Sequence, residues 1–144
     1  MVDVSGRAPS LREASAVAVV LLGEEVYPQV VKNGKINKGL QTVVQIAGIN
    51  GAKRTADLIP LCHNIPITKV TVNVDVLPEG SPGIQITSTV KTASVTGVEM
   101  EALTSVTVAA LTVYDMCKAV SHGIQIKEVK LLTKSGGRTD FKRS

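Results

Sequence analysis

Four charged side chains bracket a segment whose interior carries no charge, and they are the first candidates for chemistry in this sequence. Glu99 and Glu101 precede the uncharged positions 102–114, and Asp115 and Lys118 follow them. A helix of this composition is apolar on all sides, so we expect it to be buried. Its end charges are then drawn toward a low-dielectric interior, where a charge is costly unless it is paired or used.

Asp115 and Lys118 are spaced for contact, because residues three apart share one face of a helix. One interpretation is an ordinary ion pair on a solvated face, which contributes under about 0.5 kcal/mol. The other is a partly buried pair whose shifted pKa values suit an acid and a base. The neighbours Met116 and Cys117 are apolar, which keeps the second interpretation open.

Glu101 and Asp115 are too far apart to serve one small ligand on a single chain. They lie 14 positions apart, which corresponds to about 21 Å along a helix axis. If both act on the same small molecule, the site must lie between subunits, and each chain must contribute a different end of the helix.

Cys62 and His63 follow Pro60 in a second segment with chemical potential. Cys62 is interpreted as a small buried residue, and His63 as a polar contact or a proton carrier. Adjacent side chains usually diverge, which argues against a cysteine nucleophile beside its base. The other Cys and His, at positions 117 and 122, add no ligand spacing, so no metal site is predicted.

Basic residues occur at three places that could hold phosphate: Lys38, the pair Lys53-Arg54, and a glycine turn that begins at Lys134. Backbone N–H groups in a glycine turn, flanked by cations, can bind phosphate oxygens. Each residue alone could be solvated surface, whereas together they fit a ligand with two or more phosphate charges. Neither a P-loop nor a dinucleotide-binding glycine motif is present.

The composition indicates one globular domain over residues 1–144, with mobile ends at 1–8 and 136–144. Apolar residues make up 44% of the 144 residues and charged residues 19%. A net charge of +4 suggests an anionic ligand, whereas three aromatic residues are too few for single-strand nucleic-acid binding. No apolar run reaches the roughly 20 residues that span a bilayer. No signal peptide or disulfide framework is apparent, so we expect a cytoplasmic protein.

The hydrophobic patterns predict six elements that would position these residues. Valine content and a glycine stop favour a strand at 15–22, although a capping-box pattern at 10–13 would also suit a helix. Period-2 alternation predicts strands at 67–77 and 84–90, joined by a turn at 78–83. Helices are expected at 24–32, closed by Asn33-Gly34, from Leu40 through Ala47, and at 97–120. A last strand is expected at 124–133, with a bulge near Glu128.

This order, β-α-β-β-α-β, predicts an α+β fold. It is the order of a ferredoxin-like plait, which has a four-stranded antiparallel sheet and helices on one face. Glycines at 48 and 51 weaken the helix that contains them by about 1 kcal/mol each, so they are expected to allow close packing.

Four segments together resemble the cyclic pyranopterin monophosphate synthase family, also called molybdenum cofactor biosynthesis protein C. They are residues 1–5 (MVDVS), 52–63 (AKRTADLIPLCH), 97–119 (GVEMEALTSVTVAALTVYDMCKA) and 131–137 (LLTKSGG). The resemblance implies a lyase of molybdenum cofactor biosynthesis. It would convert 3′,8-cyclo-7,8-dihydroguanosine 5′-triphosphate to cyclic pyranopterin monophosphate and pyrophosphate. It also implies a hexamer built as a trimer of dimers, with active sites at the dimer interface.

The resemblance also implies roles for individual residues. The catalytic set would be Asp115 as base, Lys118 as acid or charge partner, and Lys38 as proton donor or phosphate clamp. Two segments would contact the substrate, and three cations would hold its phosphate tail. These substrate-binding residues are Leu61, Cys62, His63, Glu99, Met100 and Glu101, with Lys53, Arg54 and Lys134.

No resident metal or organic cofactor is expected, with Mg²⁺ allowed as a companion of the substrate triphosphate. The alternative is a non-enzymatic ferredoxin-like module that binds an anionic nucleotide.

Overall fold

Strand β1 runs through the middle of the molecule and pairs with a strand on either side, over its whole length on one side and from Glu13 to Leu21 on the other. The structure is a computed structural model that describes residues 1–78 and 81–144. The predicted turn at 78–83 therefore lies partly outside the described residues. The elements are β1 (Ser10–Leu21), α1 (Gly23–Val30), β2 (Val31–Lys32), β3 (Lys35–Ile36), α2 (Lys38–Lys53), α3 (Thr55–Leu58), β4 (Lys69–Val76), β5 (Gly83–Ser94), α4 (Glu99–Cys117), β6 (Gln125–Ser135) and β7 (Phe141–Lys142).

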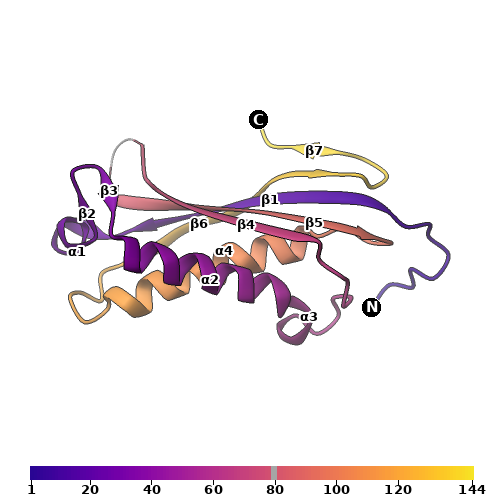
Figure 1. Cartoon of the computed structure of the whole chain (residues 1–144), viewed down its shortest axis with the longest axis horizontal. Helices are drawn as coiled ribbons and strands as arrows, with labels where there is room; N and C mark the ends of the chain where they lie inside the picture. Colours follow the sequence, from indigo (N-terminus) through magenta and orange to yellow (C-terminus); the bar gives the residue numbers. More distant parts are fainter. Residues whose placement is uncertain (79–80) are drawn as a thin grey trace.

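The main sheet is antiparallel, with strand order β4-β5-β1-β6-β7. The expected strand at 15–22 is confirmed and begins earlier, at Ser10. Residues 10–13 have a capping-box sequence, but their backbone groups pair with β5 instead, from Ser10 opposite Ser94 onward. Helices α2 and α4 cover one face of this sheet, and β7 forms its edge, away from these helices (Figure 1).

The sheet has five strands where four were expected. The additional strand is β7, which pairs with the end of β6, Lys134 opposite Phe141. Gly136 makes the return possible because it adopts φ +88, a conformation that favours glycine. A Cβ atom at this position would lie 1.9 Å from the Leu11 carbonyl oxygen, so no larger residue fits.

The expected bulge near Glu128 is confirmed. Glu128 lies opposite Val19, and the next residue of β1, Val20, lies opposite Ile126, so Lys127 has no opposite residue. A second shift occurs between Ser15 and Ala16. These two irregularities bend β6 along β1.

Asn33-Gly34 does not close a helix, which corrects the expectation from the sequence. Helix α1 ends at Val30, and Asn33 and Gly34 form the turn of a small hairpin between β2 and β3. Both residues have positive φ, 54 and 72, which is the requirement of the hairpin turn that Asn-Gly favours. The same dipeptide suits a helix end and a hairpin, and the pairing of Val31 with Ile36 decides between them.

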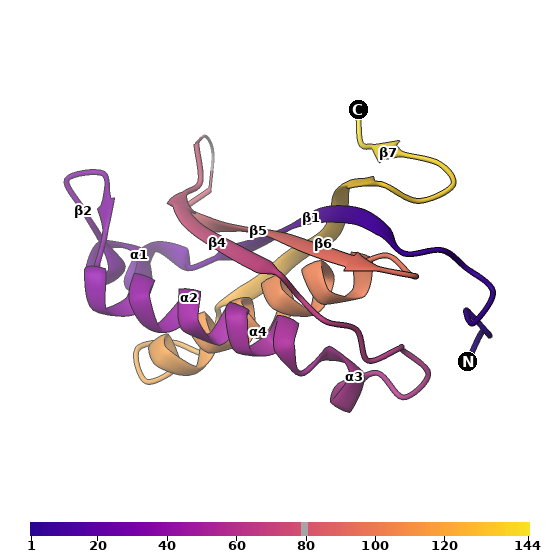
Figure 2. The same ribbon diagram turned by 45° about the vertical axis from the view of Figure 1, so that its right-hand side comes forward.

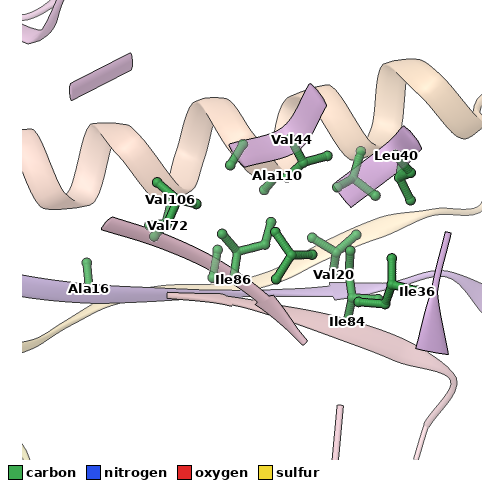
Figure 3. Packing of buried hydrophobic residues seen from close by; sticks show 14 of the residues in the cluster. Ala16, Val20, Ile36, Leu40, Val44, Val72, Ile84, Ile86, Val106 and Ala110 are labelled. Atoms are coloured by element: carbon green, nitrogen blue, oxygen red, sulfur yellow. The ribbon is translucent and has the colours of Figure 1, made fainter. Parts of the chain in front are cut away.

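Helices α2 and α4 pack closely where α2 carries its glycines. A Cβ atom at Gly51 would lie 2.9 Å from Val108 Cβ, and one at Gly48 would lie 3.2 Å from Ser105 Oγ. The expected packing role of these glycines is confirmed. The buried core lies between the helices and the sheet, with Val44, Val106 and Ile86 among its members (Figure 3).

The two helices run in opposite directions, which decides what shares each end of the molecule. The C-terminal part of α2 meets the N-terminal half of α4, since Gly51 approaches Thr104 and Val108. At the other end, Leu40 of α2 and Met116 of α4 line one small cavity of about 210 Å³. In Figures 1 and 2 the N-terminal segment of the chain lies at the same end as α3.

Candidate active site

Glu101 is a buried carboxylic acid on the first turn of α4. Its side chain faces inward because α4 packs against the sheet on one side and α2 on the other, and only 3% of the residue is exposed. Within the described residues, its Oε1 atom has no hydrogen-bond partner. Burial raises the pKa of this carboxyl, and the charge of Glu99 raises it further. A carboxyl whose pKa is raised holds its proton more readily than an exposed one, which makes Glu101 a candidate proton donor.

The loop before β4 brings Cys62 and His63 to the same end of α4. Cys62 Sγ lies 4.0 Å from Oε2 of Glu101. Burial raises the pKa of the Cys62 thiol, and the charges of Glu101 and Glu99 add to the effect, so the neutral thiol is favoured. The Nε2 atom of His63 lies 2.6 Å from the carbonyl oxygen of Val2. A carbonyl only accepts, so Nε2 of His63 is the donor in this contact.

These residues form one wall of a cavity of about 480 Å³. The volume is in the range of small-molecule sites. The lining residues are Met1, Val2, Val4, Arg7, Ile59, Leu61, Cys62, His63, Thr96, Gly97, Glu99, Met100 and Glu101. All six residues that the resemblance assigns to substrate contact, 61–63 and 99–101, therefore surround the same space, which we call the carboxylate cavity.

A second cavity, of about 740 Å³, adjoins the first and shares Arg7, Thr96, Gly97 and Glu99 with it. Its cations come from three regions of the chain: Arg7 and Arg12, Lys134, and Arg138. We call it the cationic cavity. Its remaining lining residues are Ala8, Gly136, Gly137 and Thr139. Such a set of cations beside a glycine turn can bind a polyphosphate.

Two contacts hold the walls of the cationic cavity in position. Arg12 donates from Nε to the carbonyl oxygen of Ser94 at 3.1 Å, and Ser10 donates from Oγ to the carbonyl oxygen of Gly136 at 2.9 Å. Lys134 forms an ion pair with Glu99, with 3.3 Å between Nζ and Oε1. Lys134 thus lies beside Gly136 and Gly137 in the lining of the cationic cavity.

The proposed catalytic pair lies at the opposite end of α4. Lys118 Nζ is 2.7 Å from Asp115 Oδ1, and this hydrogen bond raises the pKa of Lys118. Partial burial, the second interpretation, is not found within the single chain. The side chains of Lys118 and Asp115 are 51% and 70% exposed, because Val113 and Cys117 occupy the inward face of the helix.

Lys38, the third expected catalytic residue, starts helix α2 at this same end of the molecule. It lines a separate cavity of about 260 Å³ with Gln41 and Asp75. The preceding residue, Asn37, caps the helix by accepting from the Leu40 N–H at 3.0 Å. The antiparallel arrangement of α2 and α4 therefore brings Lys38 to the end that carries Asp115 and Lys118.

Lys53 and Arg54 line neither the carboxylate cavity nor the cationic cavity among the described residues. Both are exposed at the end of α2, and Arg54 pairs with Asp57 at 3.7 Å. The structure does not bring them together with Lys134.

Arg7 and Arg12 are cavity residues that the sequence analysis missed. Arg7 belongs to a segment expected to be a loose arm, and Arg12 to the capping-box pattern at 10–13. The other cations of the cavity, Lys134 and Arg138, are more than 120 positions away in the sequence. A run of basic residues would have been a local signal, but these cations are dispersed.

Neither a metal centre nor a membrane-crossing helix is found in the part of the chain that the structure describes. Residues 1–78 and 81–144 contain no group of three His, Cys, Asp or Glu side chains able to hold a metal ion. Over the same residues, no helix has the length and apolar character needed to cross a membrane.

Comparison with known proteins gives one consistent result. A family model described as the MoaC family matches residues 1–137. The cyclic pyranopterin monophosphate synthase of Cereibacter sphaeroides is 50% identical over 140 residues, covering 96% of this chain and 87% of that protein. The enzyme of the same name from Peptoclostridium acidaminophilum is 46% identical over 145 residues, covering 99% of this chain and 90% of that protein.

A longer relative is also similar. Molybdenum cofactor biosynthesis protein 1 of Drosophila melanogaster is 54% identical over 144 residues, which is 99% of this chain. The chain spans only 25% of the length of that protein.

Proposed function

This chain belongs to the MoaC family and works as a cyclic pyranopterin monophosphate synthase in molybdenum cofactor biosynthesis, and from this premise we propose how its own residues bind and convert the substrate. The substrate in this proposal is 3′,8-cyclo-7,8-dihydroguanosine 5′-triphosphate, and the products are cyclic pyranopterin monophosphate and pyrophosphate. The names of the relatives speak against the non-enzymatic alternative.

The observation that carries the proposal is the pair of adjoining cavities at the N-terminal end of α4. One is lined by Glu101, Cys62 and His63, and the other by three arginines and a lysine. A substrate with a polar ring system at one end and a triphosphate at the other matches this division. We propose that the ring system occupies the carboxylate cavity and the phosphates the cationic cavity.

The groups on each side suit the chemistry. Rebuilding a purine-derived ring system moves protons on and off nitrogen and carbon, which requires acids and bases. Closing a cyclic phosphate while pyrophosphate leaves builds negative charge, which nearby cations stabilise. In this proposal Lys134, Arg12 and Arg7 hold the leaving pyrophosphate, and Glu101 and His63 hold the ring system.

Asp115, Lys118 and Lys38 are proposed to complete the site from a neighbouring chain. Within one chain Asp115 lies near the far end of α4, about 21 Å along its axis from Glu101 by helix geometry. Lys118 follows it, and Lys38 begins α2 at the same end of the molecule. They are also exposed there, so a partner chain could cover them. Asp115 would then act as base, Lys118 as acid or charge partner, and Lys38 as proton donor or phosphate clamp.

A site to which two chains contribute different residues requires a homo-oligomer, and we propose a hexamer that is a trimer of dimers. The strand order β4-β5-β1-β6 with both long helices on one face supports a ferredoxin-like plait, to which β7 is added.

The two free thiols, Cys62 and Cys117, support a reducing cytoplasm as the compartment of the protein.

We propose that the reaction uses no resident metal or organic cofactor. In this proposal the acids, the histidine and the cations that line the two cavities supply the groups that the reaction needs. Any Mg²⁺ would arrive as part of the substrate triphosphate.

The direct test is turnover. The purified chain is incubated with the cyclised guanosine triphosphate, and pyrophosphate and the cyclic phosphate product are quantified. Equal amounts of the two products are expected. Release of pyrophosphate without the cyclic product, or no release, would contradict the proposal.

A further inference from the structure

The ion pair between Glu99 and Lys134 lies where the two cavities meet. Glu99 lines both cavities, whereas Lys134 lines only the cationic one. Their side chains are each about one-third exposed, 31% for Glu99 and 34% for Lys134, so solvent and small ions can reach the pair. Within the described residues, this is the only salt bridge between the start of α4 and Lys134.

The carboxylate of Glu99 lies beside Gly97. Its Oε2 and Oε1 atoms are the nearest to the position that a Cβ atom on Gly97 would occupy. A side chain at position 97 would therefore displace this flexible carboxylate. The carboxylate thus folds back over its own helix start and toward the cationic cavity.

Glu99 is the one acid among the described residues that line the cationic cavity, against four cations. It neutralises one of them, Lys134, while Arg7, Arg12 and Arg138 remain. A polyphosphate entering this cavity must therefore compete with Glu99 for the lysine.

We propose that Glu99 is an exchangeable counter-ion that occupies the place of a phosphate group on Lys134 until a pyrophosphate or polyphosphate displaces it. The inference rests on the proposed function, because it assumes that the cationic cavity receives the phosphates. When the anion is bound, Lys134 turns to its oxygens, and the Glu99 carboxylate is released toward the carboxylate cavity. When pyrophosphate is the product, the returning carboxylate competes for Lys134 and favours its departure.

The released carboxylate would act on its neighbours. The charge of Glu99 already raises the pKa of both Cys62 and Glu101 across the shared wall. Loss of Lys134 as its partner leaves that charge uncompensated. Binding of an anion in the cationic cavity would in this way change the electrostatic environment of Cys62 and Glu101 in the carboxylate cavity.

The test is direct binding of pyrophosphate, without metal, by isothermal titration calorimetry at fixed ionic strength. Glu99→Gln removes the competing charge, and we expect it to bind pyrophosphate about two- to five-fold more tightly than the wild type. Glu99→Asp, which keeps the charge but shortens its reach, should lie between the two. Glu24→Gln, a charge removal on the exposed face of α1, should leave the affinity unchanged.

The Glu99→Gln substitution is also made in Lys134→Ala protein, to distinguish competition for Lys134 from a general effect of the more positive net charge. In Lys134→Ala protein, Glu99→Gln should give little or no further gain in affinity. An equal gain in both backgrounds, or no gain in the wild-type background, would overturn the exchange while leaving the cationic cavity intact. A wild-type protein that binds no pyrophosphate would overturn the phosphate site of the proposed function as well.

Discussion

Lys118 Nζ lies 2.7 Å from Asp115 Oδ1 on the last turn of α4, at the opposite end of that helix from the buried Glu101. The pair is exposed, and neither residue is among the described residues that line the carboxylate cavity around Glu101. An exposed pair of this kind contributes little to folding. Its effects should therefore be visible in activity rather than in stability, and that separates the proposed catalytic role from a structural one.

Lys118→Ala should lower kcat/KM by about 100-fold or more, the usual contribution of a general acid or base. The thermal unfolding midpoint should stay unchanged, because the side chain is half exposed. The matched control is Lys91→Ala, which breaks an ion pair with Glu13 of similar exposure, 50% and 45%. Turnover of Lys118→Ala at the parent rate would remove Lys118 from the catalytic set.

Mixed oligomers should reveal whether the site is shared between chains. Lys118→Ala and Lys134→Ala proteins, which change opposite ends of the molecule, are each expected to be nearly inactive. After subunit exchange, random pairing makes half of the dimers mixed, with one intact site of two. About a quarter of the wild-type rate should return.

The control for subunit exchange is a mixture of Lys118→Ala with Lys38→Ala. Both changes lie at the same end of the molecule, because α2 and α4 are antiparallel. Every site in such a mixed dimer carries one of the two changes, so no activity should return. Equal recovery in both mixtures would contradict a site composed in this way.

Glu101 should make the stability of the protein fall as pH rises. Burial raises its pKa above the ordinary value of 4.5, so the folded state holds the proton in a range where the unfolded chain has lost it. Folding then takes up a proton, and stability decreases with pH from that ordinary value up to the folded-state pKa.

Glu101→Gln removes this term. The free energy of unfolding is measured by urea titration at fixed protomer concentration from pH 5 to 8. The value for the variant, relative to that of the wild type, should increase as pH rises. Glu24→Gln, at an exposed position of α1, serves as the control and should run parallel to the wild type. A difference between Glu101→Gln and wild type that is constant with pH would show that Glu101 is not the source.

Gly51→Ala should destabilise the protein by up to about 2 kcal/mol. Alanine gains up to about 1 kcal/mol of helix propensity, but its Cβ would lie 2.9 Å from Val108 Cβ, and overpacking costs about 1–3 kcal/mol. Denaturant titration measures the change. Combining it with Val108→Ala should be less harmful than the sum of the two single changes, by about 1 kcal/mol. Additive effects would place the strain elsewhere.

Much of the fold could be predicted from local patterns. The alternation around Val72 and Val74 identified β4, and length together with an uncharged interior identified α4. The slip in alternation near Glu128 marked a real register shift. The fifth strand could not be predicted, because Phe141–Lys142 is too short to carry a pattern and exists only through its pairing with β6.

The candidate site was predictable in its residue types and less so in its grouping. Composition and periodicity are enough to place charged residues at both ends of α4 around an uncharged interior, because both are properties of neighbouring residues. The burial of Glu101, the exposure of Asp115 and the cavity shared by Arg7, Arg12 and Lys134 arise only when the chain folds. Those outcomes depend on which strands pair and on the antiparallel crossing of α2 over α4, and such contacts between distant segments leave no trace in the spacing of neighbouring residues.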